Sequence, residues 1–166
     1  MKVPVQMLLL TLLLSSCSGA PYIEDTTPAL NSRVKAGDTL MVNKEIIIPP
    51  YTTALKFQFT QPIGNAGLIM DSRKFEAVCS INIKARQFKP YVITPQEIRI
   101  SKVEPFEVAG DLYEKEVGII LYLSSDELPA LDRIECRNQT EALNESGFTT
   151  GLFKQSFGDY LTINRK

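Results

Sequence analysis

The chain has 166 residues, of which 44% are hydrophobic and 22% charged, a composition that fits one globular domain with a short leader. Eighteen basic residues against 19 acidic ones leave no excess to neutralise phosphates, so we expect no nucleic-acid partner. Histidine is absent, which removes the commonest general base and the commonest metal ligand together. We therefore expect no metal and no other cofactor.

Residues 1–16 have the pattern of a signal peptide. A single Lys2 precedes the apolar run 3–14, which as a helix would cover roughly 18 Å and so falls short of the ~30 Å core of a bilayer. The run ends in Leu14-Ser15-Ser16-Cys17, which resembles the bacterial lipobox. The resemblance implies cleavage before Cys17 and acylation of its thiol, so that lipid anchors the protein to a membrane. An ordinary secretory signal with an incidental Cys17 is the alternative.

Residues 17–32 mix small, polar and proline residues without the hydrophobic period of a helix or a strand, and predict a lipidated N-terminus with a flexible tether of roughly 20 Å. In enterobacterial lipoproteins an Asp after the lipidated Cys resembles an inner-membrane retention signal. Ser18 therefore favours the outer membrane, facing the periplasm, with the inner membrane or the cell surface as alternatives. Residues 33–166 are expected to form one β-rich globular domain.

Short alternating segments separated by turns indicate strands through most of this domain. Residues 61–67 are expected to form a loop, and Asn43–Lys44 a turn. The run 117–123 is apolar on both faces, which predicts a covered strand in the middle of a sheet. The expected strands are 39–42, 45–48, 55–59, 74–84, 97–103, 117–123, 133–137 and 159–163.

One segment near the carboxyl end departs from the strand pattern. Residues 149–158 carry Leu152, Phe153 and Phe157 at helical spacing, with a threonine at the start, Thr149 or Thr150, as cap and Gly158 as stop signal. We therefore predict a mainly β fold, a single antiparallel β-sandwich or flattened barrel with one short C-terminal helix.

Two cysteines remain after Cys17. Cys79 and Cys136 each lie on the inward face of an alternating strand, in a chain expected to reach an oxidising compartment. An even pair of this kind predicts a disulfide. Two buried thiols or a redox pair are the alternatives, although neither residue belongs to a Cys-x-x-Cys motif.

Catalytic motifs are missing from the sequence. There is no Gly-x-Ser-x-Gly elbow, no histidine for a triad and no calcium-binding loop. Paired carboxylates remain, because glycosidases need only two, and four glutamates lie around a predicted hairpin turn: Glu104, Glu107, Glu114 and Glu116. Charged turns are common on soluble β-domains, and we expect no catalytic residue among them.

A basic-aromatic loop is the one candidate binding surface. It consists of Lys84, Arg86, Phe88, Lys89 and Tyr91. Such a loop could contact a phosphate-bearing lipid, a polysaccharide or a protein partner. A solvated hairpin tip without a ligand is the alternative.

Part of the chain is similar to a family of uncharacterised proteobacterial exported proteins. The similarity lies in Ile46–Pro50, Ala54–Gln58 and Phe75–Cys79, and continues in a second Cys strand, Ile134–Cys136, and a closing segment, Leu152–Ile163. The chain departs from the pattern at Tyr51, where the family has Gly, and at Ala77-Val78, where it has Pro-His. The second departure puts in doubt any ligand site built on that His. The resemblance implies a fold and a disulfide, but no reaction.

Together these features predict a lipid-anchored envelope protein without enzymatic activity. It would bind or support another envelope component, most simply a protein, at the periplasmic face of the outer membrane. One alternative is a small-ligand-binding β-barrel lipoprotein that holds an apolar molecule or a cell-wall fragment. The second alternative is a carboxylate-dependent envelope hydrolase.

Overall fold

The computed structural model describes residues 29–30, 33–63, 77–109, 114–141 and 147–165. The predicted leader, Cys17 and the tether up to residue 28 lie outside these ranges. The described elements are β1 (Thr39–Val42), β2 (Ile46–Ile48), β3 (Ala54–Gln58), β4 (Gln61–Ile63), β5 (Val78–Ile83), β6 (Tyr91–Ile93), β7 (Gln96–Ala109), β8 (Glu114–Ser124), β9 (Leu131–Glu141), α1 (Thr150–Phe157) and β10 (Leu161–Asn164).

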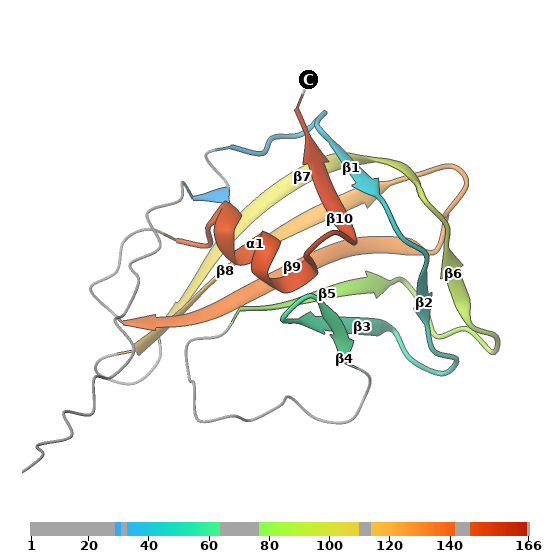
Figure 1. The fold of residues 1–166 in the computed structure, drawn as a ribbon, viewed down its shortest axis with the longest axis horizontal. Helices are drawn as coiled ribbons and strands as arrows, with labels where there is room; N and C mark the ends of the chain where they lie inside the picture. The colour runs from blue at the N-terminus through green and yellow to red at the C-terminus, as the bar shows by residue number, and fades with distance from the viewer. Residues whose placement is uncertain (1–28, 31–32, 64–76, 110–113, 142–146, 166) are drawn as a thin grey trace, which may run out of the picture.

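Eight strands form one antiparallel sheet in the order β10-β1-β7-β8-β9-β5-β3-β4. The other two strands, β2 and β6, pair as a separate antiparallel ribbon. The large sheet is curled into a half-barrel, with α1 across its open side (Figure 1). The predicted mainly β fold with one short helix is confirmed.

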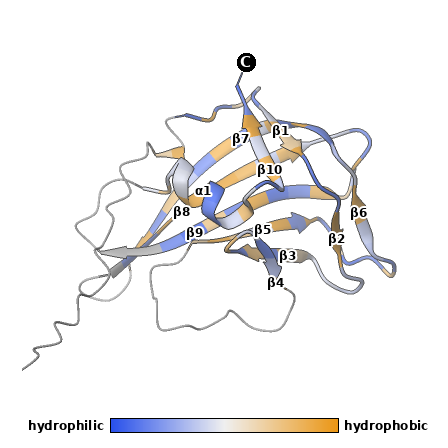
Figure 2. Ribbon diagram, viewed as in Figure 1, coloured by the Kyte–Doolittle hydropathy of each residue, from blue (hydrophilic) through white to orange (hydrophobic). Residues whose placement is uncertain are grey.

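The core lies on the face of the sheet that α1 covers, called here the inner face. Along β5 every second side chain is buried, namely Cys79, Ile81 and Ile83, because successive residues of a strand point to opposite faces. Figure 2 shows hydrophobic and hydrophilic residues interspersed in the same way along β7 and β9. β8 lies in mid-sheet as its apolar run predicts, although its outer-face residues Ile120 and Tyr122 are only half-buried.

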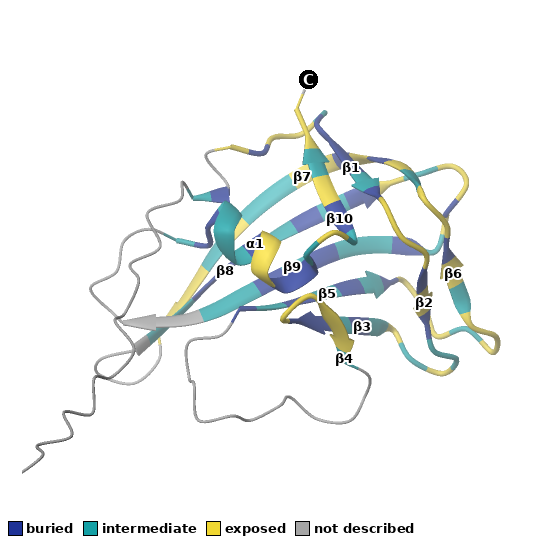
Figure 3. Cartoon of the chain, in the orientation of Figure 1, coloured by how far each residue is buried: buried dark blue, intermediate teal, exposed yellow. Residues whose placement is uncertain are grey.

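The helix closes the half-barrel because it contacts β10 at one end of the sheet and β3 and β5 near the other. It begins and ends as the sequence predicts: Thr149 caps it by accepting a hydrogen bond from the amide of Leu152 (3.2 Å), and Gly158 forms the C-cap. Phe153 and Phe157 are buried beneath it. In Figure 3 the helix shows exposed residues on the side turned away from the sheet.

The predicted disulfide is confirmed. Cys79 on β5 and Cys136 on β9 are directly opposite in the strand register, with Cα atoms 4.0 Å apart, and they are joined by a disulfide bond. Both residues are fully buried. The bond therefore fixes two neighbouring strands of the large sheet from within the core.

Three details differ from the predicted strands. The expected loop 61–67 begins with a strand, β4, that pairs with β3. The strand expected to include Phe59 ends at Gln58, because the backbone turns there. The short strand β6 is absent from the predicted set. In addition, Leu30 is buried in the core, so the packed part of the chain begins before the predicted boundary at residue 33.

The β3–β4 turn docks onto the end of the helix. Phe59 and Thr60 both have positive φ, 51° and 64°, as a two-residue hairpin turn of type I′ requires, although neither is the Gly or Asn that such turns favour. The amide of Thr60 donates to the carbonyls of Gln155 (3.1 Å) and Ser156 (3.0 Å), which the end of a helix leaves without helical partners. The turn thus contributes part of the cap of α1.

We expect Gly158→Ala to lower the free energy of unfolding by about 2–3 kcal/mol. Gly158 has φ of 56°, and a Cβ at this position would lie 2.7 Å from Cβ and Cγ2 of Thr60, so the variant adds a clash to backbone strain. Gly147→Ala is the matched control, because φ is 66° there and the nearest atom is 3.9 Å away; it should cost about 1 kcal/mol. Equal losses of unfolding free energy in urea denaturation would show that a Cβ at position 158 does not clash with Thr60.

Candidate functional site

The predicted binding loop connects β5 to β6 and projects with the β2–β3 connection at the right of Figure 1. Four of its five predicted residues are exposed: Lys84, Arg86, Phe88 and Lys89. Phe88 is 86% exposed, the most exposed large hydrophobic residue among those that the structure describes. The loop therefore presents an aromatic ring and three cations to solvent.

The fifth predicted residue, Tyr91, has a different role. Its ring packs against the core, and its hydroxyl is buried without a hydrogen bond of standard geometry in the described part of the chain. Burial raises the pKa of the Tyr91 phenol, and the nearby backbone of Leu131 and Ala130 offsets this only in part. Tyr91 thus supports the loop from beneath.

Sequence reasoning missed a second aromatic residue at this surface. Tyr51, in the β2–β3 connection, is 64% exposed and meets Phe88 edge-to-face, with ring centroids 6.1 Å apart. The amide of Tyr51 also donates to the carbonyl of Gln87 (2.8 Å), which ties the two connections together. We call the exposed side chains of Tyr51, Lys84, Arg86, Phe88 and Lys89 the basic-aromatic tip.

Tyr51 adopts a backbone conformation that costs stability. It follows Pro49-Pro50 and has φ of 63°, in the left-handed region that favours glycine at the third position of a turn. For a residue with a side chain this region costs roughly 1–2 kcal/mol. A strained position that also exposes an aromatic ring indicates a role other than stability.

The ribbon that supports the tip is also apolar on its outer side. Ile46 and Ile48 are buried, whereas Ile47 is 50% exposed and faces its register partner Val92, which is 41% exposed. Period-two alternation in the run 45–48 predicts the exposure of Ile47, because it places this side chain on the face opposite to that of Ile46 and Ile48. Val92 carries no such signal, since the sequence pattern does not predict β6.

The chain around the tip carries cations without carboxylates. Residues 46–63 and 77–96 include Lys56 and the three cations of the tip, but no Asp or Glu. Lys84 is partly engaged, because its Nζ donates to the carbonyl of Pro129 (2.8 Å) in the β8–β9 turn, which also holds the exposed Asp126 and Glu127. Within the described residues, no ion pair engages Arg86 or Lys89.

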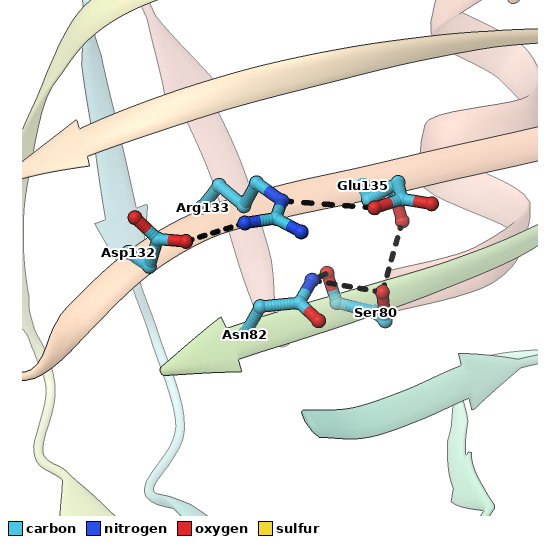
Figure 4. A network of polar contacts seen from close by, with 5 residues as sticks. All are labelled: Ser80, Asn82, Asp132, Arg133 and Glu135. Carbon is cyan, nitrogen blue, oxygen red and sulfur yellow. Dashed lines mark hydrogen bonds and ion pairs between the residues drawn. The ribbon is translucent and has the colours of Figure 1, made fainter. Parts of the chain in front are cut away.

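The outer face of the large sheet carries a second group of polar residues (Figure 4). Arg133 lies between Asp132 (Nη1 to Oδ2, 2.6 Å) and Glu135 (Nε to Oε2, 3.6 Å). On the neighbouring strand Ser80 accepts a hydrogen bond from Asn82 (3.0 Å) and donates to the backbone carbonyl of Glu135 (3.4 Å). These charges and dipoles satisfy one another, mostly within each strand, and only the bond from Ser80 to the carbonyl of Glu135 joins β5 to β9.

The glutamates considered for catalysis are paired with cations. Glu104 contacts Lys102, Glu107 lies 3.2 Å from the Nζ of Lys115, and Glu116 lies 3.9 Å from Nη1 of Arg137. The side chain of Glu114 lies outside the described residues. Hydrogen bonds from Lys102 and from Tyr122 lower the pKa of Glu104, which is opposite to the shift that a general acid needs.

The described residues hold neither a metal cluster nor a membrane-spanning helix. No group of three or more Cys, Asp or Glu side chains comes together there in a way that could hold a metal ion. No helix in the described ranges is long and apolar enough to cross a bilayer.

Comparison with known proteins found no relative: no family model matches the chain, and no curated protein or solved structure does either. The resemblances to the lipobox and to the exported family therefore remain predictions from the residues that carry them.

Proposed function

We propose that the chain is a lipid-anchored envelope protein without enzymatic activity, held at the periplasmic face of the outer membrane, where it binds or supports another envelope component. The observation that carries the binding role is the basic-aromatic tip. Its aromatic rings are exposed, and Arg86 and Lys89 have no ion-pair partner among the described residues. The described glutamates of the candidate catalytic group, by contrast, are already paired.

The disulfide supports the envelope location. Bonds such as Cys79–Cys136 form and persist in oxidising compartments and are rare in the cytosol. Export and anchoring at Cys17 would bring the domain to such a compartment. Two or more acyl chains would hold it at the membrane durably, at about 0.8 kcal/mol per buried CH₂.

The anchor is tested by Cys17→Ala. We expect the wild-type protein to fractionate with membranes and to show the mass of a chain that begins at Cys17 with added fatty acids. The variant should lack this modification, because the acylated thiol is gone. Ser18→Ala is the matched control and should retain the lipid. Intact mass spectrometry that finds wild type unacylated at Cys17 would remove the anchor from the proposal.

The binding role is tested by proximity labelling in intact cells. A labelling enzyme fused to the full chain should enrich envelope components over the same fusion carrying Phe88→Ala, Arg86→Gln and Lys89→Gln. These three residues are exposed, so the variant should fold like wild type. Identical labelling by the two fusions would count against a binding role for the tip.

A further inference from the structure

We infer that the basic-aromatic tip binds the surface of an anionic phospholipid bilayer. The inference rests on the proposed function and names the partner of its tip. The inference is based on the contact between the rings of Phe88 and Tyr51 and on the cations Arg86 and Lys89, which lie on the same loop as Phe88.

The exposed groups of the tip have the chemistry of a bilayer-binding surface. Phe88 and Tyr51 are large rings held in solvent at the end of the ribbon, next to a ribbon face that exposes Ile47 and Val92. An aromatic ring is stabilised at the boundary between headgroups and acyl chains. The phenol hydroxyl of Tyr51 can remain on the hydrated side of that boundary. Aliphatic residues beside the rings favour a bilayer over a sugar polymer, which offers no comparable apolar phase.

The charge of the tip is complementary to that of an anionic bilayer. Arg86 and Lys89 flank Phe88 in sequence, and the segments that form the tip and its ribbon, 46–63 and 77–96, contain no carboxylate. Anionic headgroups attract cations held close to the surface, and the guanidinium of Arg86 can contact a phosphate with two donors. Lys84 contributes less, because its ammonium is already engaged by the carbonyl of Pro129.

The backbone conformation of Tyr51 also favours a binding role for its ring. With φ of 63°, this position would be more stable as glycine, yet it carries an exposed ring in contact with Phe88. Strain retained at an exposed residue is explained if the ring contributes to binding.

The absence of tryptophan from the chain provides a direct test. Phe88→Trp introduces a single tryptophan, which can be excited selectively over the tyrosines, at the tip of the full, lipid-bearing protein, which is reconstituted into vesicles of phosphatidylglycerol and phosphatidylcholine. We expect emission at shorter wavelength and quenching by brominated acyl chains. Val108→Trp is the matched control, since Val108 is 53% exposed on β7, away from the ribbon, and its tryptophan should remain in water.

Substitutions in the Phe88→Trp background separate charge from apolar contact. Arg86→Gln with Lys89→Gln should weaken engagement of the tip roughly 25-fold, or about 5-fold for each charge. Tyr51→Gly should weaken engagement while leaving the melting temperature unchanged or higher, because it relieves the strained φ. A Tyr51→Gly variant that engages vesicles as wild type does would show that the ring of Tyr51 does not contribute to binding.

Three results would overturn the inference. One is an emission spectrum of the Phe88→Trp protein that does not shift with anionic vesicles, and another is an equal shift with pure phosphatidylcholine. The third is an equal shift with dextran sulfate, which would indicate a soluble polyanion instead of a bilayer. Failure of the anchor is tested separately. If Cys17 carries no lipid, the Phe88→Trp protein is added to preformed anionic vesicles. A shift in its emission would then support binding by the tip although the proposed anchor had failed.

Discussion

Replacing both Cys79 and Cys136 with alanine should lower the free energy of unfolding by about 4 kcal/mol. The bond closes a loop with a sequence separation of 57, and in the chain-entropy model a loop of this size restricts the unfolded chain by about that amount. Small domains are stable by only ~5–15 kcal/mol in total, so the loss would be a large share of the stability. The measurement is the midpoint of guanidinium unfolding under non-reducing conditions.

Reduction gives an internal control for this prediction. A reducing agent should lower the midpoint of the wild-type protein close to that of the double alanine variant, and it should leave the variant itself unchanged. Alanine is the suitable replacement, because serine would place a hydroxyl at two fully buried positions. A wild-type midpoint that does not respond to reduction of the bond would contradict the assigned role.

The second large effect is expected from Phe157→Ala, at about 4 kcal/mol. Phe157 is fully buried, with its ring centroid 5.0 Å from that of Phe57 and 4.9 Å from that of Phe153. Its removal leaves a cavity where α1 meets β3, so the helix loses its main attachment to the sheet. Thermal or chemical denaturation measures the loss.

Two other substitutions define the contribution of the ring. Lys154→Ala lies on the exposed side of the same helix and should change the stability by less than about 0.5 kcal/mol. Phe157→Leu keeps most of the apolar volume and should cost clearly less than alanine. If Phe157→Ala and Lys154→Ala had similar effects, the aromatic contact would not be what holds α1 in place.

The parts of the fold that the sequence predicts correctly are those governed by local rules. Thr149 and Gly158 bound the helix as expected, because capping needs only residues near the helix ends. Period-two alternation places Cys79 and Cys136 on inner faces, and their pairing follows from the even number. These signals are contained in a few neighbouring residues, and long-range contacts do not override them.

The parts that sequence patterns miss depend on long-range partners. β4 contains Pro62 and lies at an edge of the sheet, so it has little strand signal of its own and is defined by its pairing with β3. The turn at Phe59 and Thr60 lacks the usual turn residues. It is held instead by the amide of Thr60, which donates to carbonyls at the end of α1. At the predicted turn Asn43-Lys44 the chain only bends, at Lys44, and it passes from β1 of the large sheet to β2 of the ribbon.

The candidate site is predicted in part for the same reason. Lys84, Arg86, Phe88 and Lys89 are neighbours in sequence, so their composition is visible as a loop. Tyr51 joins them only through the contact between two connections, which no local pattern reveals. Tyr91 alternates with the loop residues in sequence but belongs to β6, where pairing with Ile48 directs it toward the core.

The pairing of β1 with β10 has a consequence for how the protein is made. The Asn43 side chain, just after β1, donates to the hydroxyl of Thr162 on β10, 119 residues later, and the β1–β10 ladder lies beside this contact. Until residues 150–164 have left the ribosome, the amino-terminal strand has no neighbour on one side and nothing closes the half-barrel. A nascent chain therefore lacks its closing helix and the edge strand β10 until nearly all of it has been synthesised.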